Sequence, residues 1–169
     1  MVAAIVLAAG ASTRYGRPKQ RELLPRVLAA LSQSPVDEVV VVAGAHPLDL
    51  EGPPGLRIVN APDWERGPGA SLRRGLEALG QDVSHAVVLL ADGPELDDRA
   101  VARLVERRAE APVVAATYDG VTRSHPVVLA RSVWAGIPDE GARALEPALV
   151  DCSDLRPPGD VDYPGDAAR

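Results

Sequence analysis

The feature that most constrains the fold is an alternation of short apolar runs with stretches of helical periodicity. Five runs rich in Val, Ile, Leu and Ala are predicted to be strands, at residues 3–7, 38–42, 56–59, 86–90 and 112–117. The first four are predominantly apolar, as strands buried on both faces of a parallel sheet are. Amphipathic helices are predicted between them, at residues 23–31, at residues 71–79 and after a cap at Asp97 or Asp98. This alternation predicts an α/β fold with a mostly parallel sheet and helices on both of its faces.

The last third of the chain is less regular. We expect a short strand at 127–129, a helix at 140–150 that Pro147 bends or ends, and an extended piece at 160–162. Neither a repeat nor a long linker interrupts the order of the elements, so the sequence predicts a single domain over residues 1–169.

Composition excludes several classes of partner. The net charge of −6 provides no basic stripe that would neutralise a nucleic-acid backbone, so any bound phosphate should belong to a small ligand. The sequence has no run of the roughly 18 apolar residues that span a bilayer, and the apolar start of the chain lacks the basic stretch of a signal peptide. We therefore expect neither nucleic acid nor membrane as a partner. A single cysteine, Cys152, forms no internal disulfide, which favours the cytoplasm.

The first predicted strand runs directly into a loop that suits phosphate groups. Residues 10–19 contain two glycines, Ser12 and Thr13, and three cationic side chains that include Lys19, the only lysine in the chain. Backbone N–H groups of such a loop can surround phosphate oxygens while Arg and Lys neutralise their charge. The loop matches neither a Walker A motif nor G-x-G-x-x-G, so neither mechanism is assumed. The alternative is a solvated, positively charged turn.

A carboxylate is predicted to face this loop. Asp92 follows the fourth predicted strand, and a doubly wound sheet places its first and fourth strands side by side where ligands bind. Carboxylate oxygens at this place would hold Mg²⁺ on a triphosphate that Arg14 and Lys19 neutralise. The alternative is an aspartate that only caps a helix or stabilises a turn before Gly93-Pro94.

Several motifs along the whole chain occur in the order known from one family. Residues 7–19 read L-A-A-G-A-S-T-R-Y-G-R-P-K, with every fixed position of the pattern L-A-A-G-x-S-x-R-x-G-x-P-K. The other motifs are similar to an N-x-x-W-x-x-G loop before a Ser-Leu helix, a D-x-P metal segment, G-H-P-V, G-A-R and D-I-D-T-P, at residues 60–72, 91–94, 124–127, 141–143 and 160–164. On these residues the chain resembles the MobA-like nucleotidyltransferases, and among them the molybdenum cofactor cytidylyltransferases.

The resemblance implies a Rossmann-like fold of the kind found in nucleotide-diphospho-sugar transferases. It also implies a nucleoside triphosphate donor, with CTP favoured, a Mg²⁺ cofactor, and a small phosphorylated acceptor such as molybdopterin. A molybdoenzyme is the candidate protein partner. The acceptor phosphate would attack the α-phosphorus directly, so no side-chain nucleophile is needed.

The resemblance also implies a role for individual residues. The residues implied to bind the nucleotide are Leu7, Ala8, Ala9, Gly10, Ser12, Arg14, Lys19, Asn60 and Ser71. Those implied to act in catalysis are Arg14, Lys19 and Asp92, because two cations and a metal would stabilise the pyrophosphate leaving group. Asp92 would bind Mg²⁺, with Asp162 or Asp160 as the second ligand. His125 is the candidate acceptor-binding residue, although a lone histidine is often structural, and Ser71 would equally serve as a helix cap.

The sequence departs from the family pattern after Lys19. The family continues with a short strand and turn resembling L-L-P-x-G-G, whereas here Lys19-Gln20 leads directly into the predicted helix. In the family this piece positions the lysine and contributes to recognition of the base. Two alternatives follow: a non-catalytic nucleotide- or cofactor-binding accessory protein, and a nucleotidyltransferase for another small phosphate such as a sugar phosphate.

Overall fold

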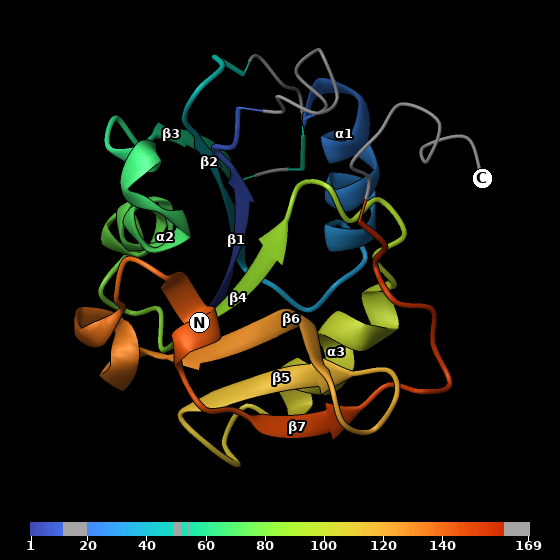
Figure 1. Ribbon diagram of the computed structural model, residues 1–169. Coiled ribbons are helices and arrows are strands. Elements are labelled where there is room, and N and C mark those ends of the chain that lie inside the picture. The colour runs from blue at the N-terminus through green and yellow to red at the C-terminus, as the bar shows by residue number, and fades with distance from the viewer. Residues whose placement is uncertain (12–19, 49–51, 54, 161–169) are drawn as a thin grey trace.

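The computed structural model describes residues 1–11, 20–48, 52–53 and 55–160 (Figure 1). Strands (β), α-helices (α) and 3-10 helices (η) follow one another as β1 (Val2–Ala8), α1 (Gln20–Leu31), β2 (Glu38–Ala43), β3 (Leu56–Asn60), η1 (Trp64–Arg66), α2 (Pro68–Glu77), β4 (His85–Leu90), α3 (Asp98–Glu106), β5 (Val113–Thr117), β6 (Arg123–Ala130), η2 (Arg131–Gly136), η3 (Gly141–Ala144) and β7 (Ala148–Asp151).

Within this part of the chain, a 7-stranded sheet has the order β3-β2-β1-β4-β6-β5-β7. β1 pairs in parallel with both β2 and β4, so that Leu7 lies opposite Val42 on one side and Leu90 on the other. β6 runs antiparallel to its neighbours β4 and β5, and β7 pairs in parallel with β5. The predicted α/β fold with a mostly parallel sheet is confirmed, as is the adjacency of the first and fourth predicted strands.

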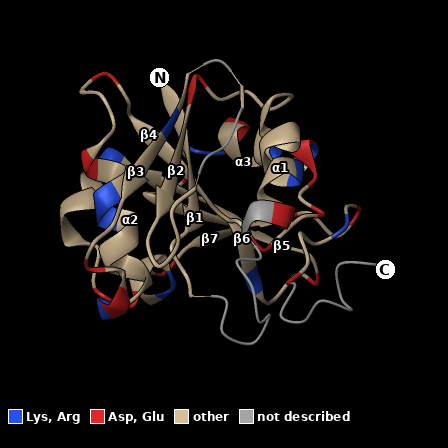
Figure 2. Ribbon diagram, turned by 90° about the horizontal axis from the view of Figure 1, so that it is seen from above, with Lys and Arg blue, Asp and Glu red and all other residues tan. Residues whose placement is uncertain are grey.

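The central strand β1 is buried because its side chains alternate between two apolar layers. Val2, Ala4 and Val6 belong to one layer, and Ala3 and Ile5 belong to the other. Helices α1 and α3 cover the first layer and α2 covers the second, so the sheet lies between helices (Figure 2). This arrangement explains why the strand runs are apolar on both faces.

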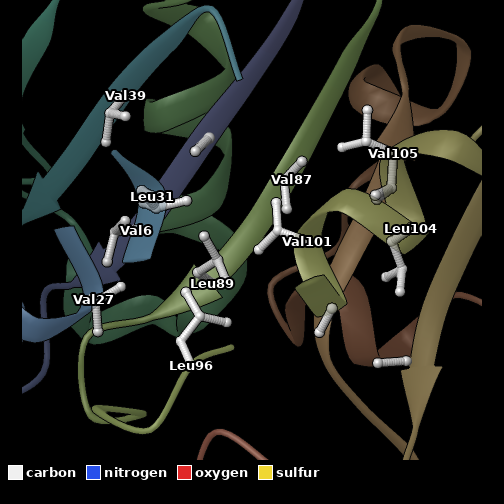
Figure 3. Close-up of a cluster of buried hydrophobic side chains, with 14 of the residues drawn as sticks. Val6, Val27, Leu31, Val39, Val87, Leu89, Leu96, Val101, Leu104 and Val105 are labelled. Carbon is white, nitrogen blue, oxygen red and sulfur yellow. The ribbon is translucent and has the colours of Figure 1, made fainter. Parts of the chain in front are cut away.

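The first layer is close-packed (Figure 3). Leu31 of α1 is 2% exposed and Leu104 of α3 is 0% exposed, and both belong to the cluster that contains Val87 and Leu89 of β4. The apolar stripe predicted at 23–31 is therefore the buried face of α1. Asp97 caps α3, since its side chain accepts a 3.0 Å hydrogen bond from the backbone N–H of Arg99.

Three details of the predicted secondary structure were wrong. The run at 56–59 was expected to be buried on both faces, but β3 lies at the edge of the sheet and Ile58 is 37% exposed. The helix expected at 140–150 is instead the short η3 followed by β7, because Pro147 cannot continue a helix and β7 then pairs with β5. The second helix begins at Pro68 rather than at Ser71, which agrees with the preference for proline in the first turn.

Candidate active site

The candidate site lies at the edge of the sheet where β1 and β4 end and the antiparallel β6 begins. Two neighbouring cavities open there, with volumes of about 180 Å³ and about 320 Å³. They share three lining residues, Leu90, Ser124 and His125. The site is therefore one crevice with two lobes, at the place where a doubly wound sheet binds its ligands.

The smaller cavity contains the two aspartates that the described residues contribute to the predicted metal site. Asp92 follows β4, and Asp160 belongs to the segment after β7. Its lining residues are Leu89, Leu90, Asp92, Gly93, Leu96, Ser124, His125, Pro158, Gly159 and Asp160. In the described part of the chain, no cluster of three or more His, Cys, Asp or Glu side chains is arranged to hold a metal ion. Two carboxylates are nevertheless what proteins commonly supply to Mg²⁺ when substrate phosphates complete its coordination.

Asp160 reaches this cavity because the segment before it packs on the loop after β4. The carbonyl of Pro158 accepts a 3.0 Å hydrogen bond from the N–H of Glu95. A Cβ atom on Gly93 would lie 3.0 Å from the Cβ of Pro158, closer than most Cβ contacts, so glycine allows this approach without a shift of Pro158. Asp162, the other candidate for second metal ligand, lies outside the described residues.

His125 lies between the two lobes near the start of β6. Burial lowers the pKa of its imidazole to about 4; the Arg123 guanidinium acts in the same direction and the Asp92 carboxylate opposes it. The side chain is thus neutral at pH 7 and can act as a hydrogen-bond donor and acceptor. The Tyr118 hydroxyl donates a 3.1 Å hydrogen bond to the backbone carbonyl of His125, which anchors the strand beneath the site.

The larger cavity is lined by both apolar and charged side chains. The apolar ones are Leu7, Pro68, Leu72, Val88, Leu90 and Ala142. Arg123, Glu140 and Arg143 supply the charged groups. The Arg123 guanidinium donates to the carbonyls of Leu145 (2.7 Å) and Arg143 (3.2 Å), so it also holds η3 in place. A lining of this kind suits a flat, mostly apolar ring that carries a few polar groups.

The wall of the larger cavity depends on a close contact between α2 and the loop before η3. The N–H of Gly69 donates to the carbonyl of Asp139 at 2.9 Å, and a Cβ atom at Gly69 would lie only 1.8 Å from the carbonyl oxygen of Pro138. Arg73 of α2 strengthens this contact, because its guanidinium donates to the Ile137 carbonyl and the Asp139 carboxylate. The hydrogen bond from Arg73 holds the pKa of Asp139 below its usual range, and Arg66 acts in the same direction.

The structure brings only part of the predicted nucleotide site into this crevice. Leu7 lines the larger cavity, while Ala8 and Ala9 are 3% and 6% exposed and continue from it at the end of β1. Gly10 follows at the surface. The other three predicted residues of this loop, Ser12, Arg14 and Lys19, lie outside the described residues.

Asn60 and Ser71 line neither of the two cavities. Asn60 ends the edge strand β3, where its carbonyl accepts a 3.1 Å hydrogen bond from Arg74. Ser71 is 3% exposed and lies within α2. It does not cap this helix, because the N-cap position is occupied by Gly67. Trp64 packs against the second core layer.

The fold and the crevice define an α/β protein of the nucleotidyltransferase type. The sequence matches the MobA-like NTP transferase domain over residues 4–149, and the chain belongs to this family. It is a nucleotidyltransferase-family enzyme. The comparison with curated proteins gave no match.

Solved structures with this fold cover nearly the whole chain. The crystal structure of Rv0371c from Mycobacterium tuberculosis H37Rv has a TM-score of 0.80 at 23% identity, over 100% of this chain and 97% of that one. Rv0371c has also been crystallised in complex with manganese (TM-score 0.75, 21% identity, 99% and 96% covered). A nucleotidyl transferase from Methanothermobacter thermautotroptrophicus, Mth528, has a TM-score of 0.72 at 20% identity, over 100% and 95% of the chains.

A more distant structure is that of CMP:2-keto-3-deoxy-manno-octonic acid synthetase in complex with CTP. It has a TM-score of 0.72 at 12% identity, over 99% of this chain and 95% of that one. At these identities the likeness shows the shared fold. Within the described residues, no helix is both long enough and apolar enough to cross a membrane.

Proposed function

We propose that the protein transfers a nucleoside monophosphate, with CTP as the favoured donor, to the phosphate of a small acceptor such as molybdopterin and releases pyrophosphate. The observation that carries this proposal is that Asp92 and Asp160, from distant parts of the sequence, line one cavity with His125. This cavity lies at the end of β4, beside the end of β1, the strand that precedes the loop predicted from the sequence to bind phosphate.

The donor set of this cavity fits Mg²⁺. Carboxylate oxygens are the ligands that this ion prefers, and it commonly keeps positions for substrate phosphates. When bound, the ion would screen the charge of the α-phosphate and stabilise the leaving pyrophosphate. The position of Asp160 in the cavity supports it as a second ligand. The manganese complex of Rv0371c supports a divalent cation in general.

The remaining roles are divided between the donor and the acceptor. Arg14 and Lys19 would neutralise the triphosphate, and the backbone of residues 7–10 would line the base and ribose. Neutral His125 would donate a hydrogen bond to the acceptor phosphate. An oxygen of that phosphate then attacks the α-phosphorus while the bond to the pyrophosphate oxygen breaks, so that positioning and charge supply the catalysis.

The larger cavity favours an acceptor with a ring system. Its leucine, valine and proline side chains offer no hydrogen-bond partners to a polyhydroxylated sugar, whereas the ring faces of a flat heterocycle such as that of molybdopterin would bury apolar surface against them. The CTP complex of the distant synthetase supports CTP as the donor. We expect the reaction in the cytoplasm and a molybdoenzyme as the recipient of the product.

The first experiment is thermal unfolding with CTP, GTP, ATP and UTP in turn, each with and without Mg²⁺. A nucleotide at 100 times its Kd adds about 2.7 kcal/mol to the free energy of unfolding. In a chain of this size that raises Tm by several degrees. A Mg²⁺-dependent shift with CTP alone supports the proposal, and a larger shift with another nucleotide corrects the base. No shift with any of the four contradicts the donor site.

The second experiment measures pyrophosphate release with molybdopterin and with a sugar 1-phosphate as acceptors. We expect Asp92→Asn to lower the rate by about 100-fold or more, because a metal ligand is removed from the reacting phosphates. Asp82→Asn is the matched control, since Asp82 is an exposed aspartate in the turn before β4, at the opposite end of that strand. Activity of Asp92→Asn within a few-fold of the control would refute the metal assignment. A preference for the sugar phosphate would refute the proposed acceptor.

A further inference from the structure

The segment after β7 is held against the rest of the protein at several points before it reaches the crevice. Figure 1 shows it in red, passing beside α3 and then meeting the loop between β4 and α3. The N–H of Cys152 donates a 2.8 Å hydrogen bond to the carbonyl of Thr117. Cys152 is 0% exposed and Leu155 is 7% exposed, and both belong to the first core layer. The beginning of the segment is thus anchored in the core.

Arg103 of α3 holds the outer side of this segment. One guanidinium nitrogen, Nη1, donates to the carbonyl of Asp151 at 2.8 Å and to Oδ1 of Asp154 at 2.6 Å. The other, Nη2, donates to Oδ2 of Asp154 at 2.9 Å. This is the forked, bidentate geometry that only arginine provides, and it limits both the distance and the orientation of the partner. Arg103 is one-third exposed, so solvent reduces but does not abolish the effect of its charge.

Two prolines and one hydrogen bond hold the segment in place shortly before Asp160. Pro157 and Pro158 follow shortly after Leu155, and each proline ring restricts the backbone to a narrow range of conformations. Pro158 then accepts the hydrogen bond from Glu95. Asp160 comes two residues later and lines the cavity of Asp92. Any change in how the segment docks is therefore expected to move Asp160 relative to Asp92.

We propose that Arg103 is a positioning residue for the metal site, and that docking of residues 151–160 and binding of a divalent cation are coupled. The inference rests on the proposed function, in which Asp160 shares a cation with Asp92. Arg103 itself touches neither cavity. Its effect would pass through Asp154 and Pro158 to Asp160. By linkage, the cation must stabilise the docked segment by the same factor by which docking strengthens binding of the cation.

The test compares two measurements on the full-length protein. Hydrogen exchange of the Glu95 amide reports docking directly, because this amide is hydrogen-bonded to the carbonyl of Pro158. The exchange rate can be measured in the absence of a metal ion. Titration with Mn²⁺ alone, followed by the electron paramagnetic resonance of the free ion, reports cation affinity. In the unaltered protein, Mn²⁺ should slow exchange at Glu95.

We expect Arg103→Met to speed exchange of the Glu95 amide and to weaken Mn²⁺ binding, each about two- to five-fold, as for the loss of one partly exposed ion pair. Arg103→Lys keeps the charge but not the fork and should fall between Arg103→Met and the unaltered protein. Arg107→Met is the matched control, because Arg107 pairs with Glu110 at the end of α3 and does not contact the segment. It should leave both measurements unchanged.

Two outcomes would overturn the inference. One is exchange at Glu95 that is equal in Arg103→Met and Arg107→Met; the other is faster exchange without weaker Mn²⁺ binding. Failure of the proposed function has a different signature: Asp160→Asn would then leave Mn²⁺ affinity unchanged even though Arg103→Met still speeds exchange at Glu95.

Discussion

The burial of a neutral His125 makes stability depend on pH in a predictable window. Its pKa is lowered from 6.5 to about 4, chiefly by burial. Below pH 6.5 the unfolded chain therefore binds a proton at this position that the folded protein does not bind, so the free energy of unfolding decreases as pH falls from 6.5 toward 4 and changes no further below that. Stability from this group is fully present above pH 6.5.

The size of the effect follows from these two pKa values. Linkage gives a loss of about 2 kcal/mol between pH 7.5 and pH 5, and about 3 kcal/mol once the pH is below 4. Partial contact of the ring with solvent makes these figures upper estimates. The pKa of about 4 includes the effects of both charged neighbours of His125, since Arg123 lowers this pKa and the Asp92 carboxylate raises it.

Urea unfolding of the unaltered protein and of His125→Gln at pH 7.5 and pH 5 measures this difference. The variant lacks the titrating ring, so the unaltered protein should lose about 2 kcal/mol more than the variant does over this interval. His85→Gln is the comparison variant, at the opposite end of β4 from the site. Partial burial lowers the pKa of His85 as well, but His85 is less buried than His125, so its loss should reduce the pH dependence less. Equal losses in the unaltered protein and His125→Gln would refute the reasoning, as would an NMR titration of His125 with a pKa near 6.5.

Three further predictions concern the walls and the loop of the crevice. Gly69→Ala should lower the free energy of unfolding by about 2–4 kcal/mol, since its Cβ would lie 1.8 Å from the Pro138 carbonyl oxygen and would separate α2 from the loop before η3; chemical denaturation measures this change. Tyr118→Phe removes the hydrogen bond to the His125 carbonyl, which should cost about 1 kcal/mol and raise KM for the acceptor more than KM for the nucleotide in steady-state assays. Lys19→Ala should raise KM for the nucleoside triphosphate and lower kcat, because a cation that neutralises the triphosphate is lost.

These predictions have their own controls. Gly136→Ala adds the same methyl group at a position where no atom lies within 4 Å of the new Cβ, so it should change stability far less than Gly69→Ala. A Tyr118→Phe variant that raises both KM values equally would assign Tyr118 a general structural role. Unchanged kinetics of Lys19→Ala would mean that the loop directs this lysine away from the triphosphate.

Local sequence patterns predicted most of the fold because the relevant forces act over a few residues. The apolar stripe at 23–31 and the cap at Asp97 each depend only on residues within or next to one helix, and both are present in the structure. The helix predicted at 140–150 was wrong because the structure of this segment depends on a distant strand. Residues 148–151 form β7, which pairs with β5, and no local pattern indicates that β5 has an unpaired edge there.

For the candidate site, too, the sequence predicted residues placed by local structure and missed contacts between distant segments. Asp92 was predicted from its place at the end of a buried strand, and the structure puts it in the crevice beside His125. The contact of Gly69 with Pro138 and the ion pair of Arg73 with Asp139 were missed. The two glycines at 67 and 69 were the only available signal, since glycine at the start of a helix often marks a close backbone approach.

By itself, the sequence determined the α/β class, the alternation of strands and helices up to residue 117, the resemblance to MobA-like nucleotidyltransferases and the end of the sheet where chemistry should occur. These features depend on periodicity, side-chain chemistry and motif spacing, which can be read along the chain. Only the tertiary structure decided that Asp160 lies in one cavity with Asp92 and that Arg103 holds the segment that brings it there. Both depend on close packing between segments far apart in the chain, and such packing is settled when the whole core forms.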